Sequence, residues 1–200
     1  MSALDERDMK LVRLFTACVL GNWDEVRRVR ASASANAGEP DRRWREAVLQ
    51  VHVFAGFPRL VEAYGVLGSL GEFDADELDA SRDVSTRGTD LFTRIYAGDA
   101  TEVRAMLERH HPDFARFILA HAYGAVLARP GLSADRRELL AVAALAALGQ
   151  ERQLASHARG AVRLGAKPAE VHAVLDAIAD LVDASRLEDA RRVVERFAPL

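Results

Sequence analysis

The feature that most constrains the fold is a helical periodicity of apolar residues that recurs along nearly the whole chain. Glycine and proline interrupt this pattern every 15 to 20 residues or so, which is typical of a many-helix bundle with short loops. Half of the 200 residues are hydrophobic, and alanine and leucine outnumber the β-branched and aromatic residues that favour strands. No segment has the pattern of a strand. The sequence therefore predicts an all-α fold.

The expected helices follow from this punctuation. Asp99 and Ser133 are candidate N-caps, Gly149 and Gly165 are candidate helix stops, and Pro168 suits the first turn of a helix. The helices are expected at roughly 5–20, 23–35, 41–55, 58–70, 87–97, 99–109, 112–128, 134–148, 151–164, 168–183 and 187–197.

Charge and hydropathy exclude several classes of partner. The formal net charge is −3, and the basic residues alternate with acidic ones, so no basic patch for nucleic acid is expected. The longest apolar run, 139–148, is about half of the roughly 20 residues that a membrane span needs, and the acidic start of the chain does not resemble a signal peptide. We therefore expect a cytoplasmic protein with neither nucleic acid nor membrane as a partner.

A glutamate and a histidine flank the most apolar helix. If the helices 134–148 and 151–164 fold back on each other at Gly149, Glu138 and His157 come within about one helical turn of the same level. A partly desolvated carboxylate beside an imidazole can act as a proton relay. The alternative is structural, since a negative charge is favoured near a helix N-terminus and a buried histidine is commonly only a hydrogen-bonded core residue.

The second of these helices carries its polar residues on one stripe. Gln150, Gln153 and His157 share a face, which we expect to be the inward one, while the arginines at 152, 159 and 163 lie opposite. Burial without a partner would cost about 1–3 kcal/mol for each polar group. These side chains should therefore be satisfied by one another, by Glu138, by water or by a ligand.

Thiol and metal chemistry find little support in the sequence. Cys18 is the single cysteine, so no disulfide or cysteine-based zinc site can form within one subunit, and we expect a buried free thiol. His52 lies in an apolar helix with no identifiable partner, and His121 and His172 have no spaced companion that would suit a metal. No metal and no cofactor are expected.

The two halves of the chain show a faint periodicity. Gly21 and Gly149 lie 128 residues apart, as do Pro40 and Pro168, and the segment 68–88 is rich in glycine, serine and acidic residues like a connector. This pattern alone leaves open whether the halves are related.

A longer stretch carries a resemblance to a known family. In residues 111–166, "YG" before "RPGL", followed by "REL", an alanine- and leucine-rich helix, "QL", "SH" and "GA", resembles the carboxymuconolactone decarboxylase family of the AhpD-like superfamily. Residues 44–64 resemble the later part of the same domain. The resemblance implies an AhpD-like helical bundle with two fused copies. These would be a degenerate copy over 1–70, a connector over 71–86, and a domain with the candidate site over 87–200.

The resemblance also bears on the chemistry. Peroxidases of the superfamily carry the pattern E-x11-C-x2-C-x3-H, whereas this chain keeps Glu138 and His157 at that spacing and places Gln150 and Gln153 at both cysteine positions. A thiol peroxidase needs a nucleophilic and a resolving thiol, so the resemblance favours the decarboxylase branch. In the first copy, Lys10 and Val29 occupy the equivalent positions of the glutamate and histidine, so that copy should lack the site.

The leading hypothesis is cofactor-free decarboxylation, or proton transfer, on a small carboxylated lactone or enol-type acid. Glu138 and His157 would be catalytic. The expected substrate-binding residues are Gln150, Gln153, Tyr123, Arg129 and Arg137. One alternative is a ligand-binding or scaffold protein without chemistry, and a third is hydroperoxide reduction through Cys18 with another protein's thiol. The resemblance further implies a homo-oligomer, either a trimer or a dimer.

Overall fold

A computed structural model describes residues 3–34, 42–73, 75–78 and 83–200. No strand occurs within these ranges, which confirms the all-α prediction. The first half contains α1 (Glu6–Leu20), α2 (Trp23–Ser34), α3 (Arg42–Leu67), α4 (Ala75–Leu78), α5 (Val84–Tyr96) and the 3₁₀ turn η1 (Ala97–Asp99). The second half contains α6 (Ala100–His110), α7 (Pro112–Phe117), the π-helical η2 (Ile118–Leu127), α8 (Ala134–Ala147), α9 (Glu151–Leu164), α10 (Pro168–Ala177) and α11 (Ala184–Phe197).

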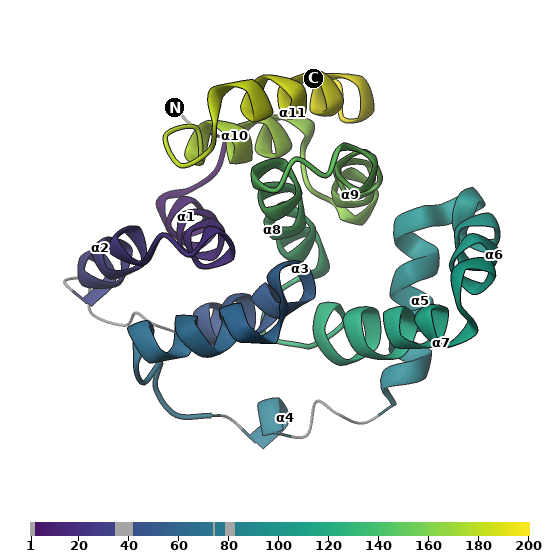
Figure 1. Cartoon of the computed structure of the whole chain (residues 1–200), viewed down its shortest axis with the longest axis horizontal. Coiled ribbons are helices and arrows are strands. Elements are labelled where there is room, and N and C mark those ends of the chain that lie inside the picture. The colour runs from purple at the N-terminus through teal and green to yellow at the C-terminus, as the bar shows by residue number, and fades with distance from the viewer. Residues whose placement is uncertain (1–2, 35–41, 74, 79–82) are drawn as a thin grey trace.

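Helix α8 is the centre of the larger group of helices. Every residue from Arg137 to Ala147 is buried, and α1, α3, α9, α10 and α11 pack around this helix (Figure 1). Its many alanines allow the neighbouring helices to approach closely, because a methyl side chain fills little of the space between two axes. The alanine-rich sequence thus explains why α8 can be surrounded on nearly all sides.

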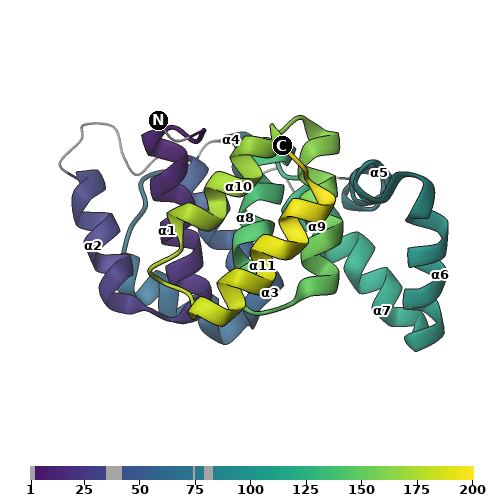
Figure 2. The same ribbon diagram turned by 90° about the horizontal axis from the view of Figure 1, so that it is seen from above.

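The helices α5, α6, α7 and η2 form a second group at one end of the molecule (Figure 2). They enclose a smaller core that includes Leu91, Phe92 and Ile95. Helices α5 and η2 cross in close contact at two glycines: a Cβ on Gly88 would lie 2.1 Å from the Leu119 carbonyl oxygen, and one on Gly124 would lie 1.9 Å from that of Val84. Only glycine fits at this crossing. Contacts of α5 with α9 and of η2 with α3 join the two groups.

One predicted helix break is confirmed and one predicted helix needs correction. The helices expected at 41–55 and 58–70 lie within α3, where Gly56, with a positive φ of 81° and a ψ of 165°, interrupts the helix just before Pro58 and leaves two helical segments. Proline removes a backbone donor and disturbs the preceding turn, so the kink falls where the sequence suggested a break. The predicted helix 112–128 divides into α7 and η2, where the hydrogen bonding changes to the π pattern.

The predicted helix ends agree with the structure in part. Gly165 ends α9 in the left-handed conformation, and Pro168 opens α10. Asp99 and Ser133 precede α6 and α8, but neither side chain makes a capping hydrogen bond. Across the described ranges, no helix combines the length and hydropathy needed to cross a bilayer.

The helix starts agree with the faint periodicity of the sequence. α1 and α8 begin at residues 6 and 134, and α2 and α9 begin at 23 and 151, so both pairs are 128 residues apart. The duplication itself stays a prediction. Pro40 and parts of the expected connector 71–86, namely 74 and 79–82, lie outside the described residues.

Candidate functional site

Glu138 and His157 form a buried pair between α8 and α9. The two helices run antiparallel on either side of a short turn, and Glu138 Oε2 lies 2.8 Å from His157 Nδ1. Glu138 is 1% exposed and His157 is 7% exposed. The contact predicted from the spacing of the two residues is therefore present in the fold.

A glycine on α9 makes room for the carboxylate. A Cβ on Gly160 would lie 2.7 Å from Glu138 Oε2 and 2.9 Å from Ile95 Cγ2, both shorter than real Cβ contacts. Because a buried carboxylate has little freedom to move away, any larger residue at this position would push it from the imidazole. Gly160 is thus part of the construction of the pair.

The pair leaves one ring nitrogen of His157 available. The carboxylate accepts a hydrogen bond from Nδ1–H, so in the neutral ring Nε2 carries the lone pair. Within the described residues, Nε2 makes no hydrogen bond to the protein. Burial by itself lowers the pKa of His157, but the Coulombic attraction and the hydrogen bond of Glu138 outweigh it, so the pKa is raised above its ordinary value of 6.5. His157 can therefore both hold and release a proton at Nε2.

His157 lies in the wall of a cavity of about 680 Å³ between the two groups of helices. Most of the lining is apolar and comes from α3, α5, α6, η2 and α8, including Phe54, Phe92 and Leu145. Apart from the half-buried Ser156, the polar lining residues form two sets. Tyr96, Tyr123 and His157 are largely buried, whereas Gln150, Arg152 and Gln153 are exposed at the rim. The cavity thus has a polar mouth, apolar walls and a polar inner end.

Two tyrosines meet in the cavity wall. Tyr123 donates a hydrogen bond to the hydroxyl of Tyr96, with 3.1 Å between the oxygens. Burial raises the pKa of both phenols, and the negative charge of Glu138 adds to this, so both stay protonated at neutral pH. Tyr123 was predicted to line the site, whereas Tyr96 was not, because nothing in the spacing of the sequence links α5 to the pair.

The comparison with known proteins covers the part of the chain that contains the pair. Residues 112–196 match the model of the Carboxymuconolactone decarboxylase family. This segment is similar to domains of that family. The 4-carboxymuconolactone decarboxylase of Acinetobacter baylyi (strain ATCC 33305 / BD413 / ADP1) is 41% identical over 59 residues, which are 30% of this chain and 44% of that relative. The match thus spans less than half the length of the curated relative.

Within the matched segment, the predicted orientation of the two glutamines needs a correction. We expected Gln150 and Gln153 to face inward and to need buried partners, but both side chains are exposed at the rim of the cavity. The cavity opens at the N-terminal end of α9, so the first turn of the inward stripe lies at its mouth and only His157 is deeply buried. Arg152, placed by the sequence on the opposite face, also lines the mouth.

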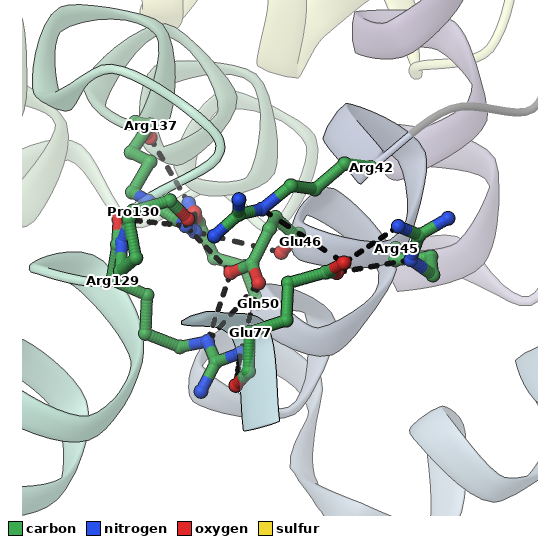
Figure 3. A network of polar contacts seen from close by, with 8 residues as sticks. All are labelled: Arg42, Arg45, Glu46, Gln50, Glu77, Arg129, Pro130 and Arg137. Atoms are coloured by element: carbon green, nitrogen blue, oxygen red, sulfur yellow. Dashed lines mark hydrogen bonds and ion pairs between the residues drawn. The ribbon is translucent and has the colours of Figure 1, made fainter. Parts of the chain in front are cut away.

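The structure does not bring Arg129 and Arg137 to the cavity that His157 lines. Both guanidinium groups bind the buried carboxylate of Glu46 on α3, at 2.9 Å and 2.7 Å respectively. Arg137 also donates to the side chain of Gln50 at 3.3 Å, and Arg129 donates to the carbonyl of Glu77 at 3.2 Å (Figure 3). We expected these two arginines to bind the carboxylate of a substrate. Instead, both bind the carboxylate of Glu46, which belongs to the protein itself.

A histidine pair outside the Glu138–His157 site was also missed. His52 Nε2 on α3 lies 2.8 Å from His121 Nε2 on η2, and His52 Nδ1 lies 2.6 Å from the Leu49 carbonyl oxygen. Phe57 stacks on His52 with 4.8 Å between the ring centroids. His121 thus has a companion from 69 residues away, which the local spacing of the sequence could not reveal. Within the described ranges, no group of three or more potential metal ligands includes the pair.

Cys18 is buried in α1, as predicted. Burial raises the pKa of its thiol to about 12, so almost no thiolate is present at neutral pH. Because the thiolate is the reactive form, this burial argues against peroxide reduction by Cys18.

Proposed function

We propose that this chain is a cofactor-free carboxy-lyase that acts on a small carboxylated lactone or a related enol-type acid. The observation that carries the proposal is the buried Glu138–His157 pair, whose second ring nitrogen is left for a ligand in a largely apolar cavity. The match to the decarboxylase family supports the same reaction class. Family membership alone does not define a substrate, so the chemistry has to follow from the site.

The pair suits the proton step of such a reaction. Loss of CO2 breaks a carbon–carbon bond and leaves its electron pair as a dienolate, which must take up a proton on carbon. His157 would deliver that proton from Nε2, and Glu138 would hold the ring in the required tautomer and stabilise its charged form. The apolar walls favour the step, because the carboxylate loses its charge on reaction and a desolvated charge is costly.

Substrate binding falls to residues at both ends of the cavity. With Arg129 and Arg137 engaged by Glu46, we propose Arg152 as the cation for a substrate carboxylate, since its guanidinium has no ion-pair partner among the described residues and lies at the rim. Gln150 and Gln153 would bind oxygens of the substrate at the mouth. Tyr123 would contribute at the inner end.

A ligand-binding protein without chemistry is the second candidate. The observation in its favour is the predominantly apolar lining of the cavity, which would hold a ligand as readily as a substrate. Hydroperoxide reduction remains the least supported, because glutamines stand at both thiol positions and Cys18 is buried.

A homo-oligomer, as a trimer or a dimer, is part of the proposal and is tested by light scattering.

An assay of 4-carboxymuconolactone turnover, monitored by the release of CO2, separates these candidates. We expect Glu138→Gln and His157→Asn to lower kcat by about 10²- to 10⁴-fold, the usual effect of removing a general acid or base. His110→Asn is the matched control, because His110 is exposed and lies outside the cavity. Full turnover in both site variants would contradict the proposal. Stabilisation of the wild-type chain by the lactone without CO2 release would favour the second candidate.

A further inference from the structure

The inner end of the cavity holds a pair of hydroxyl groups that the proton step does not use. Tyr96 comes from the end of α5 and Tyr123 from η2, so two neighbouring helices of the second group each supply one ring. Phe92 fixes both rings, with centroid distances of 4.5 Å to Tyr96 and 5.1 Å to Tyr123. Such packing holds the hydroxyls in place before a ligand arrives, which is a requirement for preorganised hydrogen-bond donors.

The two tyrosines together have one hydroxyl proton that their mutual hydrogen bond does not use. Two phenols carry two hydroxyl protons, and their mutual hydrogen bond of 3.1 Å uses one of them. The donor in that bond is Tyr123, the more deeply buried of the two, and the proton of Tyr96 has no acceptor among the described residues. Since Tyr96 lines the cavity, a ligand oxygen is the available acceptor.

The pair is also built to remain a donor. Burial raises the pKa of both phenols, and the nearby carboxylate of Glu138 makes a tyrosinate still less favourable. A hydroxyl that already accepts a hydrogen bond is polarised and donates more strongly. The hydrogen bond that Tyr96 donates would be stronger to a negatively charged oxygen than to a neutral one.

We propose that Tyr96 and Tyr123 form an oxyanion-binding donor pair for an enolate or phenolate oxygen, carried by a ligand with an apolar ring body. The ring body follows from the walls around the pair, which include Val53, Phe54, Ile118 and Leu127. The inference rests on the proposed function in so far as the enolate arises from decarboxylation. It adds a catalytic residue, Tyr96, and a substrate class, cyclic compounds with an enolisable carbonyl.

In the proposed reaction, the enolate oxygen is the atom that Tyr96 binds. The bond between the ring carbon and the carboxylate breaks, CO2 leaves, and the electron pair moves into the ring and onto this oxygen. The carbon then takes the proton from His157 Nε2 while the electrons return from the oxygen to restore the carbonyl. Solvent gives His157 a new proton, and both tyrosines keep theirs.

Binding of 4-nitrophenol tests the pair without any need for turnover. Its phenolate and phenol absorb at different wavelengths, so absorbance titration gives the affinity of each form at a pH where both are present. We expect Tyr96→Phe to weaken phenolate binding about tenfold or more, as for the loss of a hydrogen bond to a charged group, and Tyr123→Phe to have a smaller effect in the same direction. The remaining tyrosine, Tyr64, lies outside the cavity, so Tyr64→Phe is the matched control.

A second probe separates loss of the donor from loss of the cavity. 4-Nitroanisole has the same ring but no ionisable oxygen, and we expect wild type and Tyr96→Phe to bind it equally. Phenolate binding that is equal in wild type and Tyr96→Phe, or absent from the wild type, would overturn the inference.

The two proposals fail separately. If His157→Asn abolishes CO2 release while Tyr96→Phe leaves phenolate binding unchanged, the donor pair is wrong and the proposed function stands. If phenolate binding depends on Tyr96 while the wild type releases no CO2 from the lactone, the donor pair stands and the decarboxylase proposal is wrong.

Discussion

Arg137 and Glu138 are consecutive residues on α8, and both are buried charges, yet they build opposite kinds of site. Arg137 turns toward α3, where its guanidinium meets Glu46 and Gln50 (Figure 3). Glu138 turns toward α9, where it meets His157. Each of the two is 1% exposed, so burial does not distinguish them.

The difference lies in what the partners leave available. The Glu46 carboxylate is shared by two arginines, so its charge is already compensated within the protein, although Glu46 and Arg129 also line a separate cavity of about 280 Å³. In the other site, one carboxylate serves one imidazole, whose second nitrogen faces a cavity. A buried charge therefore indicates chemistry where its partner keeps a nitrogen or oxygen available to a ligand in a cavity, whereas a carboxylate bound by two arginines indicates structure.

The largest expected effect on stability comes from removing one of the two arginines that bind Glu46. Arg137→Met leaves Glu46 with a single arginine in a buried place, and we expect the free energy of unfolding to fall by about 3 kcal/mol. Urea denaturation measures this. Arg152→Met, an exposed change of the same residue types, should stay within about 0.5 kcal/mol of wild type. Equal losses in the two variants would remove the distinction between the sites.

Glu138→Gln should behave in the opposite way. The amide oxygen can still accept from His157 Nδ1, so we expect a loss of only about 1 kcal/mol in unfolding free energy, although turnover falls steeply. The same urea experiment, run beside the turnover assay, gives both values. A stability loss as large as that of Arg137→Met would mean that the pair is structural.

Gly160→Ala would place a methyl group against the Glu138 carboxylate and Ile95, and so disturb the Glu138–His157 pair without touching Glu46. The new methyl group would lie 2.7 Å from Glu138 Oε2, so we expect a loss of about 1–3 kcal/mol and weaker contact with His157. Gly65→Ala is the matched control, because a Cβ at this position in α3 meets nothing within 4 Å. There the change should be neutral or stabilising by about 0.5–1 kcal/mol, as alanine favours a helix. A loss at Gly65 equal to that at Gly160 would contradict the steric argument.

The smallest effects concern pH, and two histidines should respond with opposite signs. The raised pKa of His157 means that its contribution to stability is fully present below 6.5 and declines as the pH rises through the folded-state pKa. Burial lowers the pKa of His52, against a raising effect of the Leu49 carbonyl, and the charge of His121 lowers it further, so the folded state loses stability as the pH falls below 6.5. Urea unfolding of His157→Asn and His52→Asn across this range should diverge from wild type at opposite ends. If the free energy of unfolding changed with pH in the same way in both variants, Glu138 would not raise the pKa of His157.

The parts of the site that could be predicted are those formed by neighbours in the chain. Glu138 and His157 are 19 residues apart on helices joined by a short turn, so spacing and helix geometry were enough. Glu46 lies 83 and 91 residues from its two arginines, and no local sequence pattern predicts such a contact. Tyr96 was missed for the same reason, since its place beside Tyr123 depends on how α5 crosses η2.

The fold shows the same limit. The helices around α8 followed from apolar periodicity and from Gly165 and Pro168, which act through local backbone geometry. The break at Gly56 also followed from the sequence, but the π-helical η2 did not, because it depends on packing: the close crossing at Gly124 accompanies the change in hydrogen bonding.

The central claim, that Glu138 makes His157 a proton-handling group, is tested most directly by an NMR pH titration of the ¹⁵N-labelled imidazole. We predict a His157 pKa above 6.5, a neutral form protonated at Nδ1, and a lower pKa in Glu138→Gln. A neutral form protonated at Nε2, or a pKa unchanged by the substitution, would contradict the claim.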